Sequence, residues 1–210
     1  MARSQEPFPI TPESSNQSVQ ERQLVAEAQR LAKNQAANDA YIKKEYPNEV
    51  FISSTAQLRA VNEYTKNLTI PENVYIARSR TIIKSNEQRK TLEKELRQAG
   101  ILTKLGNSIF LTPEPGKYKE RVMDAVVNGI PYEFRNIIGK SRQIEQAFSD
   151  AKSKDKNANV FLNIDSVIGK AEAMRRLIMV LNRHPEYTGK IIVSFKGERT
   201  YFWDTDSLKQ

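Results

Sequence analysis

Hydrophobic positions follow two different periods along this chain, and they divide it into helices and strands. Apolar residues recur every three to four positions over residues 18–45, which predicts a long amphipathic helix that ends before Pro47. A shorter helix is predicted over 53–67, and alternation over 74–83 predicts a strand. Residues 1–17 are rich in Pro, Ser and Gln, so we expect a poorly ordered tail there.

The long first helix carries a narrow apolar stripe. The stripe consists of Leu24, Val25, Ala28, Leu31 and Ala32. Apolar side chains at this spacing lie on one face of a helix. We therefore expect the stripe to pack on the body of the protein or on a partner, and we see no chemistry in it.

The strongest local signal is Asn128-Gly129 between two apolar runs over 122–137. This dipeptide suits the type I′ turn of a β-hairpin, which needs positive φ at both central residues. A two-residue turn fixes the register, so that Val127 faces Ile130 and Asp124 faces Glu133. Because side chains alternate across a strand, one face is wholly apolar. That face carries Met123, Ala125, Val127, Ile130, Tyr132 and Phe134, and the other carries Val122, Asp124, Val126, Pro131, Glu133 and Arg135.

A third helix precedes the hairpin. Ser85 and Gln88 form a capping box, and the apolar stripe continues to Ala99, after which Gly100 is the expected stop. Residues 101–111 then predict a pair of strands that turn near Gly106.

After the hairpin, buried runs alternate with helices. Helices are predicted over 142–152 and 166–183, and strands over 159–164, 190–195 and 200–203. This order predicts an α/β protein with a mixed sheet that helices cover on both faces. We divide the chain into a tail at 1–17, a mainly helical region at 18–83 and a second domain at 84–210.

The charge is strongly basic and unevenly distributed. The net charge is +8; residues 1–83 hold 10 Lys and Arg against 9 Asp and Glu, so the excess lies in 84–210. A basic domain suits a polyanionic partner, nucleic acid before membrane. The absence of cysteine excludes thiolate chemistry, and a single His means that any metal would bind carboxylates. No apolar run reaches membrane-spanning length and no signal pattern begins the chain, so we expect a cytoplasmic protein of the producing or target cell.

Two opposed carboxylates mark the candidate site. Asp124 and Glu133 face each other across the hairpin, with Cβ atoms roughly 4.5–5.5 Å apart, where like charges are destabilising. A bound hard cation is one reason to keep such a pair. The other reading is that Arg135, on the same face, neutralises them on a solvated sheet surface.

The residues from 85 to 203 resemble a known family. The segment MDAVVNGIPYEFRNI, the helix after it, NVFLNID and the closing KIIVSFKGER are similar to the C-terminal nuclease domain of contact-dependent growth inhibition (CdiA-type) toxins, within the PD-(D/E)XK nucleases. This resemblance implies a restriction-endonuclease-like mixed sheet flanked by helices, with an N-terminal helical extension. It also implies a metal-dependent nuclease toxin that cleaves tRNA, with DNA as the other substrate, and a cognate immunity protein as partner.

The resemblance also implies roles for individual residues. Asp124 and Glu133 would bind one Mg²⁺ or Mn²⁺, and Glu95, with Glu93 as alternate, would hold a water molecule. Arg135, Lys140 or Lys152 would stabilise charge in the transition state. The expected nucleic-acid contacts are Lys140, Arg142, Arg175, Arg176 and Arg183.

The chain departs from the family pattern at two positions. Met123 replaces the usual Pro before Asp124, and Arg135 replaces the Lys of Glu-x-Lys. Arginine is a poor general base. An inactive nucleic-acid-binding module on the same fold is therefore an alternative. A metal-independent RNase of the barnase or colicin type is a third, although only His184 is available to it. Tyr201 and Trp203 are expected to close a core rather than to stack on bases.

Overall fold

One eight-stranded mixed sheet organises the described part of the chain. The computed structural model describes residues 19–114, 122–196, 200–205 and 208, so the expected tail at 1–17 lies outside it. Within that part, each strand pairs with the strands next to it in the sequence. Some of these pairs are parallel and the others are antiparallel, so the sheet is mixed. The strands are β1 (Phe51–Ile52), β2 (Val74–Ala77), β3 (Ile109–Leu111), β4 (Ala125–Val127), β5 (Ile130–Ile137), β6 (Asn159–Ile164), β7 (Lys190–Phe195) and β8 (Thr200–Asp204). The predicted α/β class is confirmed.

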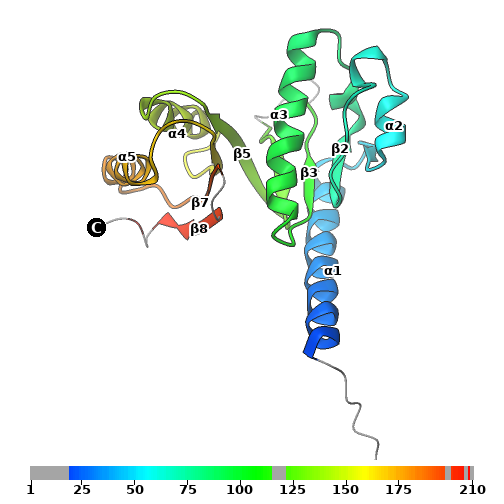
Figure 1. Ribbon diagram of the computed structural model, residues 1–210, viewed down its shortest axis with the longest axis horizontal. Helices are drawn as coiled ribbons and strands as arrows, with labels where there is room; N and C mark the ends of the chain where they lie inside the picture. Colours follow the sequence, from blue (N-terminus) through cyan, green and yellow to red (C-terminus); the bar gives the residue numbers. More distant parts are fainter. Residues whose placement is uncertain (1–18, 115–121, 197–199, 206–207, 209–210) are drawn as a thin grey trace, which may run out of the picture.

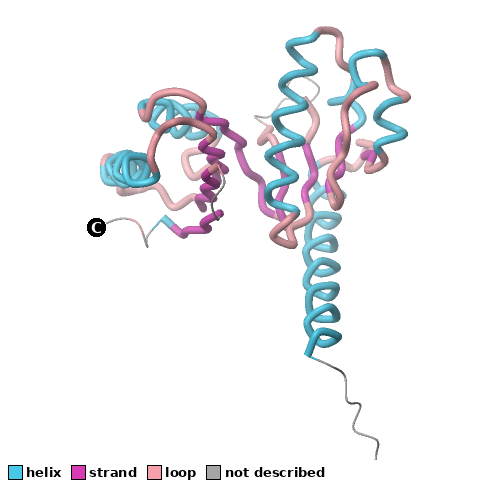
Figure 2. Tube along the Cα trace, in the orientation of Figure 1, coloured by secondary structure: helices cyan, strands magenta, loops and turns pink. Residues whose placement is uncertain are grey.

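Helices cover different parts of the two sheet faces. The α-helices are α1 (Val19–Glu45), α2 (Thr55–Arg59), α3 (Asn86–Thr103), α4 (Arg142–Lys154) and α5 (Lys170–Asn182), and 3-10 turns span Glu63–Thr65 and Arg78–Thr81. Helix α3 covers β2 to β5 on one face, whereas α4 and α5 lie together over the opposite face of β5 to β7 (Figures 1 and 2). No described helix is both long and apolar enough to span a membrane.

The hairpin has the predicted turn and register. Asn128 and Gly129 have φ of 51° and 81°, and Val127 pairs with Ile130. The turn is held from outside, since the Asn128 side chain accepts a hydrogen bond from the Ser108 N–H at 3.0 Å. Its apolar face packs as expected, except that Met123 packs with the core on the α4 side.

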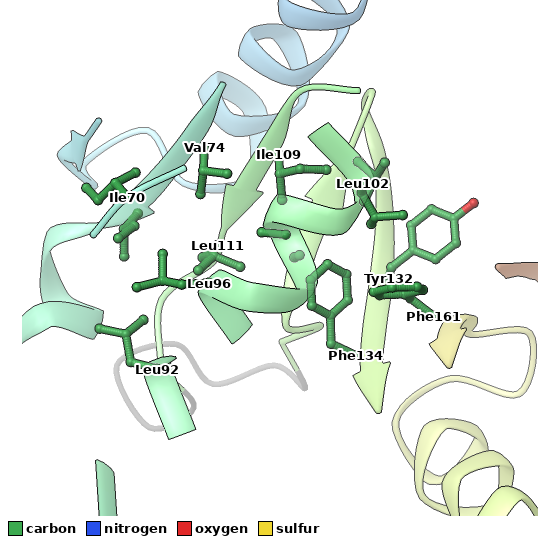
Figure 3. Packing of buried hydrophobic residues seen from close by; sticks show 14 of the residues in the cluster. Ile70, Val74, Leu92, Leu96, Leu102, Ile109, Leu111, Tyr132, Phe134 and Phe161 are labelled. Carbon is green, nitrogen blue, oxygen red and sulfur yellow. The ribbon is translucent and has the colours of Figure 1, made fainter. Parts of the chain in front are cut away.

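Three apolar clusters pack on the sheet in the described residues: a small one beneath α1, with Ile42, Tyr46 and Phe110, and two larger ones on opposite sides. On the α3 side, Leu92, Leu96 and Leu102 pack on Ile109, Leu111 and Phe134 (Figure 3). On the other side, α4 and α5 pack on β6 and β7 through residues that include Phe148, Leu177 and Tyr187. Tyr201 and Trp203 join this second core and stack on each other, so the prediction that they close a core is confirmed.

Only the carboxyl-terminal half of α1 packs on the body. Asn38 is fully buried; its side chain donates to the Ser108 carbonyl at 2.8 Å and accepts from the Gly129 N–H at 2.7 Å. Residues 19–30 are all exposed, and Figure 1 shows this half extending away from the sheet. Of the two expectations for the stripe, packing on the body does not hold for Leu24 and Val25, which are 65% and 46% exposed. That the stripe packs on a partner protein stays a prediction.

Several predicted boundaries were wrong. Helix α3 runs through Gly100 to Thr103, because the missing side chain of Gly100 lets Pro71 pack closely and Leu102 is buried as a helical residue. Only β3 remains of the strand pair expected over 101–111. The helix over 53–67 is only the short α2 and a 3-10 turn, and the strand over 74–83 ends at Ala77. The helix expected from residue 166 begins at Lys170.

Candidate active site

The two predicted carboxylates meet on the hairpin. Asp124 immediately precedes β4 and Glu133 lies in β5. Asp124 Oδ2 accepts a hydrogen bond from the backbone N–H of Phe134 at 2.9 Å, which ties the Asp124 side chain to the neighbouring strand. Glu133 points to the face that α4 covers, and its side chain has no exposed surface.

Two cations lie against these carboxylates. Arg135 Nη2 is 2.5 Å from Glu133 Oε1, and Lys154 Nζ is 2.6 Å from Glu133 Oε2. The same two cations are 3.8 and 3.7 Å from the oxygens of Asp124. We call Asp124, Glu133, Arg135 and Lys154 the carboxylate–cation cluster. Its charges balance, and Arg135 and Lys154 keep 29% and 22% of their side chains exposed, so solvent reaches it from one side.

Burial makes the charge on Glu133 costly. Desolvation raises the pKa of Glu133 above its usual value, and the nearby Asp124 carboxylate raises it further. Hydrogen bonding to Lys154 and the charge of Arg135 oppose that rise. Asp150 on α4 lies 3.9 Å from Arg135 at the edge of the cluster. Such a strained group of charges is typical of functional sites.

Lys154 is the lysine that contacts both carboxylates. The sequence assigned this place to Lys140 or Lys152. Among the described residues Lys140 is exposed and makes no ion pair with the cluster, while Lys152 bonds to Glu186 at 3.0 Å. The helical period of α4 could have identified Lys154. Position 154 follows Ala151 by three residues and so lies on the same face as the buried Ile144, Ala147 and Phe148, whereas position 152 does not.

Glu95 is bound to a residue that sequence reasoning missed. Arg80 holds both oxygens of Glu95, at 2.5 and 2.9 Å, and also donates to the carbonyls of Thr112 and Asp124. Burial raises the pKa of Glu95, and the Arg80 guanidinium opposes that rise. Glu95 therefore lies close to Asp124 but is held by an internal partner. Glu93 is on the surface, where it pairs with Arg89.

The predicted nucleic-acid residues lie on and around α4 and α5. Arg142 is exposed at the start of α4, and Arg175 is exposed on α5 beside Glu172. Arg176 and Arg183 both pair with Glu145, at 2.6 and 2.7 Å, and so connect α5 to α4. These arginines have an evident structural role, and their contact with nucleic acid stays a prediction.

The single histidine lies in a separate polar group. His184 Nδ1 is 2.8 Å from Lys152 Nζ, and both contact Glu186. The His184 and Glu186 side chains are 41% and 62% exposed. A general acid or base needs a positioned substrate as well as a partner, and no described contact joins this group to the carboxylate–cation cluster.

The donor set of the cluster fits a divalent metal of the hard type. Asp124 and Glu133 offer carboxylate oxygens, the ligands that Mg²⁺ and Mn²⁺ prefer. Glu133 Oε1 is buried and makes an ion pair with Arg135 at 2.5 Å without a well-directed hydrogen bond, so a metal would compete with Arg135 for this oxygen. Among the described residues, no group of three or more His, Cys, Asp or Glu side chains is placed so that it could hold a metal ion, so Asp124 and Glu133 would be a two-carboxylate site.

Comparisons with known proteins find one structural likeness. No protein-family model matches the sequence, and neither does any functionally curated protein. Among solved structures, the chain is similar to one titled "CdiA-CT/CdiI toxin and immunity complex from Burkholderia pseudomallei". The match has 21% identity and a TM-score of 0.44, and it covers 65% of this chain and 94% of that chain.

Proposed function

We propose that this chain is a metal-dependent nuclease toxin that hydrolyses phosphodiester bonds in RNA, with tRNA as the favoured substrate. The observation that supports the proposal is the meeting of Asp124 and Glu133 with Lys154 and Arg135 on one sheet face. The net charge of +8 suits a nucleic-acid substrate. The toxin role, the tRNA substrate and a cognate immunity protein come from the sequence resemblance of residues 85–203.

The cluster contains the groups that phosphodiester hydrolysis needs. Asp124 and Glu133 would hold Mg²⁺ or Mn²⁺, which when bound supplies Lewis-acid polarisation of the phosphate. Lys154 and Arg135 are cations at the same place, and they would bind and orient the anionic phosphate and stabilise its growing charge. The Arg80–Glu95 pair positions Asp124, since Arg80 donates to the Asp124 carbonyl.

The test is cleavage of total tRNA and of plasmid DNA with Mg²⁺ or with EDTA. Asp124→Asn is the informative variant, because an Asn side-chain oxygen can still accept the Phe134 N–H while the charge is lost. We expect Mg²⁺-dependent cleavage of tRNA and a loss of about 100-fold or more in the variant. Asp39→Asn, at an exposed position on α1, is the matched control and should cleave as the wild type does.

The inactive binding module is the alternative. It is favoured by the four cation contacts that already engage the Asp124 and Glu133 carboxylates. Intact substrates in every condition, together with salt-sensitive binding, would reject the nuclease and support this module. Cleavage that persists in EDTA and in Asp124→Asn would reject the carboxylate site itself.

A further inference from the structure

A part of the sheet beside α3 has no helix over it. Helices α4 and α5 pack on one face of β6 and β7, and α3 reaches only Phe161 and Ile192 on the other. Two cavities open on that second face. One of about 330 Å³ is lined by Lys190, Ile192 and Phe202 from the sheet, and one of about 840 Å³ by Asn163, Ser194 and Thr200.

The two cavities are consecutive along the same strands. Lys190, Ile192 and Ser194 alternate onto one face of β7, and the register places Phe202 opposite Ile192 and Thr200 opposite Ser194. The cavities therefore lie next to each other along roughly 13 Å of β7, from Lys190 to Ser194, at about 3.3 Å per residue, and Thr200 of the larger cavity is two residues from Phe202 of the smaller. We call this stretch the β7–β8 groove. Its other wall is the second half of α3 and the residue after it, with Arg97, Ile101 and Lys104, along the larger cavity, and Asn107 with the β4–β5 hairpin along the smaller one.

The groove is basic. Arg97, Lys104 and Lys196 line its larger cavity, and Asp165 is the one carboxylate among the described residues lining it. Asp165 is 3.0 Å from Lys196. The Arg97 and Lys196 side chains are 62% and 78% exposed, so solvent and a ligand can reach them, although Arg97 also lies 4.0 Å from Glu93. An excess of cations along a groove attracts a phosphate backbone.

The groove also contains an exposed aromatic ring. Phe202 is 53% exposed, whereas the neighbouring Tyr201 and Trp203 turn to the other face and pack in the core. Exposing a large apolar ring has a solvation cost, and a flat ring in a basic groove is a surface on which an unpaired base can stack. A duplex hides its base faces, so the ring selects a single strand.

We infer that the β7–β8 groove binds a single-stranded segment of RNA, with phosphates along Arg97, Lys104 and Lys196 and a base stacked on Phe202. This surface is separate from the carboxylate–cation cluster, which lies on the α4 side of the sheet. The inference rests on the proposed function for RNA as the polymer. It adds a second contact surface that anchors an unpaired part of the substrate.

The experiment measures binding apart from cleavage. A fluorescent oligouridylate is titrated by anisotropy at several salt concentrations with the Asp124→Asn protein as the background. We expect Phe202→Leu to weaken binding about tenfold and Phe202→Trp to preserve it, because leucine is apolar but offers no ring. Lys104→Ala should lower the slope of log K against log salt by about 0.7, the value for one phosphate contact to a single strand. Lys33→Ala, at an exposed position on α1, is the control and should change neither.

The outcomes separate this inference from the proposed function. Binding that depends on Phe202 and Lys104 while the wild type cleaves nothing would reject the nuclease and support the groove. Cleavage by the wild type with unchanged oligouridylate binding in both groove variants would reject the groove alone. Equal binding of oligouridylate, single-stranded DNA and duplex RNA, with no effect of Phe202→Leu, would also overturn it.

Discussion

Two groups of charge lie near each other in this protein, and they differ in how closed they are. Arg80 and Glu95 form a bidentate pair in which the side chains are 4% and 11% exposed. In the carboxylate–cation cluster, Glu133 is equally buried, but its partners Arg135 and Lys154 are 29% and 22% exposed. One group is sealed inside the protein, and the other opens to solvent through its cations.

This difference in exposure suits the Arg80–Glu95 pair to a structural role and the carboxylate–cation cluster to a chemical one. The Arg80 guanidinium is 4% exposed and donates to the carbonyls of Thr112 and Asp124 as well as to Glu95; the exposed Glu114 carboxylate lies 3.8 Å from it on the outer side. The cations of the cluster sit where a phosphate can approach them. A buried pair is a weak source of net stability but is costly to break, and an open cluster is cheaper to change. Three variants test this contrast.

The largest expected effect comes from breaking the sealed pair. Arg80→Met leaves the Glu95 carboxylate buried without a counter-ion, and we expect the free energy of unfolding to fall by about 3–5 kcal/mol. Urea denaturation followed by circular dichroism measures it. The double variant Arg80→Met/Glu95→Leu should lose less than the single one, because no charge remains buried. A loss below about 1 kcal/mol in the single variant would show that Glu95 finds water or another partner.

A smaller and chemically specific effect is expected at the open cluster. Lys154→Met removes a cation beside Glu133 and should lower tRNA cleavage about 100-fold, with a modest change in stability because Arg135 still pairs with Glu133. Lys152→Met, two residues away on the same helix, removes a cation that bonds to Glu186 and should leave cleavage within about threefold of the wild type. The reverse ranking of the two variants would move the site to the His184 group.

The smallest effect is expected where ion pairs are largely exposed. Glu145→Gln loses the pairs with Arg176 and Arg183, whose side chains are 27% and 57% exposed, and should lower the free energy of unfolding by about 0.5 kcal/mol. Cleavage at saturating tRNA should not change. RNA affinity measured in parallel should rise slightly if the two freed arginines contact the backbone, as the sequence predicts. A large fall in the free energy of unfolding would contradict the idea that the burial of an ion pair decides how much stability is lost when it is broken.

The sequence predicted the local geometry of the site well. Asn128-Gly129 specified the turn, the turn specified the register, and the register placed Asp124 and Glu133 on one face next to Arg135. Each step depends on residues within a few positions of one another, and local rules of turn and strand geometry are strong. The ends of helices and strands were predicted less accurately. Gly100 was predicted to end its helix, but the helix continues beyond it, where Gly100 packs against Pro71.

What the sequence by itself determined is therefore the hairpin, the α/β class and the basic charge. Only the tertiary structure decided which distant side chains join the hairpin. Lys154 reaches Glu133 because α4 packs across β5, and Arg80 reaches Glu95 because β2 and α3 lie side by side. Likewise, Lys104 lines a cavity with Ser194 and Thr200 only because the end of α3 lies beside this part of the sheet. Periodicity fixes the face that a side chain takes on its own element, whereas the element that it meets depends on how the whole sheet is assembled.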